Sequence, residues 1–168
     1  MNRIVILGTG HATVTRCYNT CFVLQTDTTT LLVDAGGGNG ILQRLEQAGI
    51  AIKDLHHMYV THAHTDHILG TIWVIRMVLS ATGYEGRFHV YSHAKVLRVI
   101  SMICGETLSA KHRRLMGERV VMHEVGDGTG FNVGDIGMQS FDIHSKKEPQ
   151  YGFRATLPGG AVVVCLGD

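Results

Sequence analysis

Four side chains of the kinds that bind metal ions lie within six residues near the middle of the sequence. They are His62, His64, Asp66 and His67, and the segment follows an apolar run and precedes an amphipathic one. In an extended chain, residues two apart point the same way, so His62 and His64 can direct both imidazoles to one point. Asp66 and His67 then fall at the start of the next helix, displaced enough to serve a second centre. Imidazole and carboxylate ligands suit Zn²⁺, and also Mn²⁺ or Fe²⁺.

A surface loop that is merely rich in histidine is the alternative interpretation of this segment. Its position on a strand-to-helix turn argues against that interpretation, because the helix N-terminus favours the charged form of a carboxylate. The charged form is the one that binds metal. We therefore expect a metal site at residues 62–67.

Short apolar runs recur along the chain and are separated by Gly-rich or polar breaks. Runs rich in β-branched residues predict strands at residues 4–7, 20–24, 31–33, 58–60, 88–91, 120–125, 138–143, 151–157 and 161–166. Stripes of apolar residues at helical spacing predict helices within residues 41–48, 68–79 and 94–103. Strands dominate both ends, with the helices among them. This order predicts a single domain of the α/β class, with layers of sheet and helices packed outside.

Composition narrows the classes of function. The formal net charge of +1 gives no general attraction to nucleic acid, and the one basic cluster, at residues 111–119, is typical of a solvated helix face. The four cysteines form no C-x-x-C pair, and the apolar run at residues 4–7 is too short for a signal peptide or a membrane span. We expect a cytoplasmic protein with no membrane partner.

The segment His62-x-His64-x-Asp66-His67 matches the H-x-H-x-D-H signature of the metallo-β-lactamase superfamily, and its surroundings resemble the ribonuclease Z-like branch. His144 precedes Tyr151-Gly152-Phe153-Arg154, similar to the family's His before a Gly-aromatic-Arg strand. The chain ends on Gly167-Asp168, similar to the strand end that delivers a bridging carboxylate. Further similar segments are residues 7–10, 19–22, 32–36 and 68–70.

The resemblance implies an αββα sandwich and a site with two divalent metal ions, Zn²⁺ in the first place. One ion would be held by His62, His64 and His144, and the other by Asp66 and His67, with Asp168 bridging the two. Asp66 would also be a candidate for the base that accepts the proton of the attacking water. Asp34 would steady the signature loop by hydrogen bonds without binding metal. Lys146 and Lys147 beside His144 are candidates for contact with a substrate phosphate.

The resemblance covers residues 1–168, but the family's fold continues beyond the equivalent of Asp168. The second half of the sandwich is incomplete in this sequence, and the last metal-binding His of the family has no counterpart. We expect either that further residues complete the fold or that a second chain, as in a homodimer, does so. These residues expressed alone are expected to associate or to be insoluble.

The resemblance implies a metal-dependent hydrolase, in the first place a phosphodiesterase that acts on a small, cyclic or nucleotide-like phosphodiester. Ribonuclease Z carries a long arm for tRNA between the counterparts of His144 and Asp168, and this sequence has no room for one there. Processing of an RNA 3′ end is nevertheless the second hypothesis, because some such subunits borrow the arm from a partner. A metal-binding or regulatory module without catalysis is the third. Thioester and lactone hydrolysis also remain open.

Overall fold

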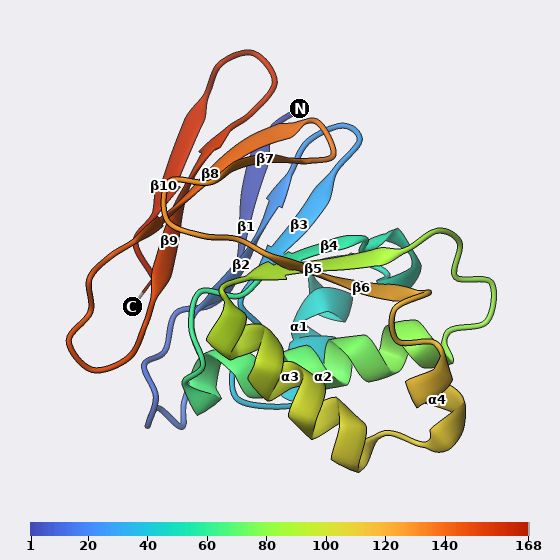
Figure 1. The fold of residues 1–168 in the computed structure, drawn as a ribbon. Helices are drawn as coiled ribbons and strands as arrows, with labels where there is room; N and C mark the ends of the chain where they lie inside the picture. Colours follow the sequence, from blue (N-terminus) through green and yellow to red (C-terminus); the bar gives the residue numbers. More distant parts are fainter. Residues whose placement is uncertain (168) are drawn as a thin grey trace.

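The computed structural model describes residues 1–167 and has three layers, with a six-stranded sheet between a layer of helices and a four-stranded sheet (Figure 1). The six-stranded sheet has the order β1 (Arg3–Gly8), β2 (Cys21–Gln25), β3 (Thr30–Val33), β4 (His57–Tyr59), β5 (Phe88–Ser92) and β6 (Val120–Glu124). The four-stranded sheet has the order β10 (Val162–Cys165), β9 (Tyr151–Thr156), β8 (Ile136–Asp142) and β7 (Gly130–Val133). The helices are α1 (Gly40–Gln47), η1 (Ile52–Asp54, a 3₁₀ turn), α2 (Thr65–Ser80), α3 (Ala94–Thr107) and α4 (Ala110–Arg114).

The predicted α/β class and every predicted strand and helix are present, with small shifts at the ends of the elements. The strand β7 and the short helices η1 and α4 are additional. Gly130 and Asn132 within β7 are residues that strands disfavour, which explains why composition alone did not predict this strand. The basic cluster was expected on a helix face, and its first part forms α4.

The connections of the six-stranded sheet bring three loops to one edge. Strands β1 to β3 are antiparallel, whereas β3 to β6 are parallel and are linked through helices. The carboxyl ends of parallel strands meet at the same edge, which is where ligand sites form in open α/β sheets. The residues that follow β3, β4 and β5 therefore lie side by side, and they include Asp34, the segment 60–64 and His93.

Two apolar cores hold the layers together. One lies between the helices and the six-stranded sheet and contains alternate strand residues such as Val23, Leu32 and Met58. The other lies between the two sheets and contains the strand residues that point to the opposite face. In it, Tyr59 and Phe153 are in edge-to-face contact, with ring centroids 4.9 Å apart. The strand period of two thus allows both faces of one sheet to be buried.

Helix α2 fixes the position of the signature segment. It buries Ile68, Val74, Ile75 and further residues at helical spacing against the sheet. Gly70 is required where α2 crosses the loop after β3, because a Cβ there would lie 1.8 Å from the carbonyl oxygen of Ala35. Within residues 1–167, none of the helices has the length and apolar composition that crossing a membrane requires.

Three histidines form a cluster on β4, β5 and β6. The His89 Nδ1 and His123 Nε2 atoms are 2.8 Å apart, and the rings of His57 and His89 stack with centroids 5.4 Å apart. Burial, reinforced by the neighbouring imidazoles, lowers the pKa of His57 to about 4. The pKa values of His89 and His123 are also lowered, mainly by burial. The cluster therefore stays uncharged in the fold at pH values where the unfolded chain takes up protons.

This cluster predicts a loss of stability in acid. Because the pKa of His57 is lower in the fold than in the unfolded chain, its contribution is complete above pH 6.5 and is lost as the pH falls towards 4. At pH 5 the loss from His57 is expected to be about 2 kcal/mol. Urea unfolding at pH 7 and pH 5 measures it. His57→Gln should flatten the pH dependence, whereas His11→Gln, at an exposed position, should not. Equal slopes in both variants and the parent would contradict the prediction.

Candidate metal centre

The signature segment begins directly after β4 and is held in place by its backbone. Val60 N donates to Tyr91 O at 3.0 Å, and Tyr151 N donates to Thr61 O at 3.0 Å. The segment is thus hydrogen-bonded both to β5 and to the start of β9. Thr61 and His62 are completely buried. Helix α2 begins at Thr65, so Asp66 lies in its first turn, as expected.

His62 and His64 come together as the spacing predicts. His62 Nε2 and His64 Nδ1 are 2.9 Å apart, and the ring centroids are 4.5 Å apart at an interplanar angle of 80°. On the other side of the ring, His62 Nδ1 lies 2.9 Å from the Thr61 hydroxyl. Two histidine nitrogens on different residues therefore face one point between them.

Asp66 and His67 form a second pair beside the first. Asp66 Oδ2 lies 3.4 Å from His67 Nε2, and the His67 ring centroid is 4.1 Å from that of His62. Ligands about 2.1 Å from one tetrahedral ion are separated by about 3.4 Å. The second pair has this spacing, and the first is slightly closer. The donor types and their arrangement in two pairs therefore fit divalent metal ions.

Asp34 connects the whole segment from the adjacent strand end. Its Oδ1 accepts from Thr61 N at 2.8 Å, and its Oδ2 accepts from the Thr61 hydroxyl and from His67 Nδ1, both at 2.8 Å. The residue is buried and has a positive φ of 54°, a conformation that side chains other than Gly rarely adopt. Backbone strain at this position is tolerated because the carboxylate accepts three hydrogen bonds.

These hydrogen bonds set the tautomers of two imidazoles. A carboxylate only accepts, so His67 must carry its proton on Nδ1 and its lone pair on Nε2. The Thr61 hydroxyl gives its only proton to Asp34, so it accepts from His62, which therefore also carries its proton on Nδ1. Both histidines then present the lone pair of Nε2, and His64 Nδ1 donates to that of His62. Neutral imidazole with the other nitrogen hydrogen-bonded is the metal-binding form.

The other residues predicted for the site are not among the paired donors. The His144 side chain is 83% exposed, with φ 56°; its Nδ1 lies 3.7 Å from Asp142 Oδ2, and its backbone N–H donates to Asp142 Oδ1. Lys146 and Lys147 are exposed on the same loop. Asp168 lies outside the described residues. Among residues 1–167, no three His, Cys, Asp or Glu side chains form a group that could hold one ion, so the described donors form pairs.

Two residues beside the site carry no signal in the sequence. His93 is buried, stacks on Tyr151 with ring centroids 4.9 Å apart, and has a pKa lowered mainly by burial. Lys95 pairs with Glu148 at 2.6 Å and ties the loop that carries His144 to the start of α3. These contacts join positions more than fifty residues apart, and no local pattern marks them.

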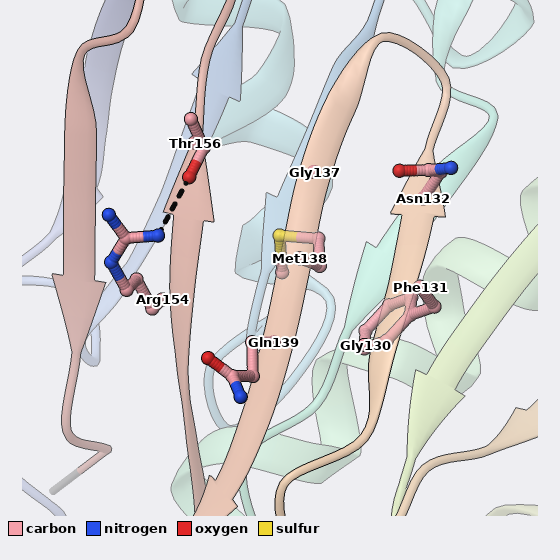
Figure 2. Close-up of a pocket in the computed structure, with 8 residues that line it drawn as sticks. All are labelled: Gly130, Phe131, Asn132, Gly137, Met138, Gln139, Arg154 and Thr156. Carbon is pink, nitrogen blue, oxygen red and sulfur yellow. Dashed lines mark hydrogen bonds between the residues drawn. The ribbon is translucent and has the colours of Figure 1, made fainter.

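A hollow of about 360 Å³ on the four-stranded sheet is separate from this centre. Figure 2 shows its lining, with Gln139 and Arg154 on neighbouring strands and Arg154 donating to Thr156 at 3.0 Å. None of the predicted site residues lines it. The chemistry expected from the sequence therefore lies at the edge of the larger sheet and not in this hollow.

Comparison with known proteins shows the family and the fold of the chain. Residues 2–157 match the family model described as Anti-Pycsar protein Apyc1. A ribonuclease Z of Mycolicibacterium gilvum is 26% identical over all of this chain, which spans 62% of that protein. The crystal structure of the short form of human tRNase Z has a TM-score of 0.77 at 18% identity. The match covers 100% of this chain and 69% of the tRNase Z chain.

The metallo-β-lactamase fold protein YhfI from Bacillus subtilis has a TM-score of 0.73 at 18% identity. The match covers 98% of this chain and 62% of the YhfI chain. These likenesses confirm the expected fold and the expected relationship to ribonuclease Z. The chain spans less than two thirds of the length of the curated relatives that it matches.

Proposed function

Because the chain belongs to the Anti-Pycsar protein Apyc1 family, we propose that it is a metal-dependent hydrolase whose substrate is a small phosphodiester, cyclic or nucleotide-like. The observation that carries the proposal is the pairing of donors, His62 with His64 and Asp66 with His67, beside the Asp34 carboxylate, which sets the tautomers of His62 and His67. A histidine-rich loop without a role needs no buried carboxylate to orient it.

The predicted site residues would bind two metal ions. His62 and His64, with His144, would hold one ion, Asp66 and His67 the other, and Asp168 would bridge them. When bound, two divalent ions supply a water of lowered pKa and neutralise the oxygens of a phosphate under attack. At the first pair, His64 would carry its proton on Nε2 instead of Nδ1, so that the lone pairs of His62 Nε2 and His64 Nδ1 would both face the ion.

The chain's own groups would complete the reaction. A carboxylate oxygen of Asp66 would accept the proton of the attacking water, since Asp66 lies in the first turn of α2 next to His67. Asp34 would keep the imidazoles in the ligand tautomer. The ammonium groups of Lys146 and Lys147, exposed beside His144, would attract the phosphate.

Processing of an RNA 3′ end is the second candidate, favoured by the relatives named ribonuclease Z. In this chain β9, a turn and β10 fill residues 151–165, where the sequence leaves no room for an arm. A small diester is therefore preferred over a self-sufficient tRNA enzyme. Turnover of a precursor tRNA but not of a cyclic nucleotide would reverse that preference.

Metal content tests the proposal first. The complete protein, in which the fold is filled out by further residues or by a second chain, is expected to hold about two divalent ions per chain by elemental analysis, in the first place Zn²⁺. The double variant His62→Ala, His64→Ala should hold at most about one. His89→Ala, His123→Ala is the matched control, because it removes another facing histidine pair, 2.8 Å apart, outside the site. Absence of bound metal after reconstitution with Zn²⁺ or Mn²⁺ would refute the proposed centre.

A further inference from the structure

A groove of about 380 Å³ runs between α2 and α3, outside the metal centre. The two helices pack against each other and cross on the outer side of the six-stranded sheet (Figure 1). Its walls are formed by Gly37, Leu69, Ile72, Trp73, Arg76, Ile103, Thr107 and Leu108. Neither the paired donors nor Asp34 line it. The groove therefore does not include the proposed ligands, although it adjoins them at Gly37, where a Cβ would lie 3.6 Å from Asp66 Cα.

The walls of the groove are mainly apolar and include an aromatic face. Four aliphatic residues line the groove with Trp73, two from α2 and two from the end of α3, and Trp73 is 40% exposed although it is large and apolar. Volumes of about 300–1,000 Å³ with mostly apolar walls are typical of small-molecule sites. An exposed indole beside aliphatic walls favours a flat ring, because stacked rings gain contact area with little loss of conformational freedom.

One positive charge stands at the groove. Arg76 is exposed and lies three residues after Trp73, so both side chains project from the same face of α2. Among residues 1–167, its guanidinium group has no ion pair and no hydrogen bond that would occupy it, and no carboxylate lines the groove. The Thr107 hydroxyl adds a second polar group from α3. A negatively charged group on the ligand would match this charge and could be bound by two parallel hydrogen bonds.

We propose that the groove between α2 and α3 binds a small planar aromatic anion. The ring lies against Trp73, between the aliphatic side chains of the two helices. The carboxylate or phosphate of the ligand pairs with the Arg76 guanidinium.

The chain offers a direct probe of this site, because Trp73 is its only tryptophan. The indole N–H therefore gives one side-chain peak in a ¹⁵N–¹H correlation spectrum. Titration with 2-naphthoate should move this peak with saturation, with a Kd on the order of 1 mM for a ligand of this size. The neutral analogue 2-naphthamide should bind at least about fivefold more weakly, because it lacks the charge that pairs with Arg76.

Arg76→Gln should remove the preference for naphthoate over naphthamide while leaving the naphthamide response in place. Arg98→Gln is the matched control, since Arg98 is exposed on α3 and does not line the groove. An indole peak that does not move with either compound would overturn the proposal. So would equal binding of both compounds by the parent protein, or an indole peak that moves with protein concentration alone, which would show a second copy on this face.

Discussion

Asp66→Asn is expected to lower the rate of hydrolysis of bis-p-nitrophenyl phosphate by a factor of at least about one hundred. Asp66 is buried in the first turn of α2, with Oδ2 3.4 Å from His67 Nε2. Asparagine keeps the size of the side chain but carries no negative charge and accepts no proton from water. The substitution therefore removes both a proposed ligand and the proposed base.

Steady-state kcat for this diester measures the effect. Asp54→Asn is the control, because Asp54 is an exposed acid of η1, which precedes β4, whereas the signature segment follows β4. In the parent protein, kcat should rise with pH through the lowered pKa of the bound water and then level off. Unchanged diesterase activity in Asp66→Asn would place the active site elsewhere.

Asp34→Asn is expected to weaken metal binding by about ten- to one hundredfold, although Asp34 would not touch the ion. Its carboxylate accepts from Thr61 N, the Thr61 hydroxyl and His67 Nδ1. The amide oxygen of asparagine can still accept from Thr61 N, but its NH₂ group then faces the Thr61 hydroxyl and His67 Nδ1, which are both donors. His67 must move its proton to Nε2 to accept from that NH₂ group, and Nε2 is the atom that would bind the ion.

Competition with a chelator of known affinity measures the metal, and ¹⁵N shifts of the His67 ring report the tautomer directly. Asp135→Asn is the matched control, because Asp135 also accepts from a threonine hydroxyl, Thr26, but lies outside the site. If the affinity falls while the His67 tautomer stays the same, the proposed role of Asp34 is wrong.

Much of the fold followed from local sequence pattern. Apolar alternation and helical stripes predicted all of the elements except β7, η1 and α4. Elements buried on one face must carry such periods, whatever their neighbours. Strand β7 was not predicted, because Gly130 and Asn132 leave little alternation of apolar and polar residues within it. It forms through its pairing with β8.

The paired donors of the signature segment could also be predicted, because the sequence spacing of His62, His64, Asp66 and His67 determines which of these side chains lie together. An extended stretch that enters a helix places two side chains on one side and the next two a short step away, as the 2.9 Å and 3.4 Å separations show. The positions of His144 and Asp168 rested on resemblance alone. The metal roles of all six residues stay predictions.

By itself, the sequence determined the kinds and spacing of the donors and the elements that carry them, because both depend on neighbours along the chain. Only the tertiary structure decided which nitrogen of each imidazole carries the proton. Asp34 is 33 residues from His67, and the two meet because β3 and β4 are parallel neighbours whose ends share one edge. Likewise, Trp73 and Arg76 line a groove only because α3 crosses α2. Such contacts depend on how layers pack, and packing is a property of the whole chain rather than of any segment.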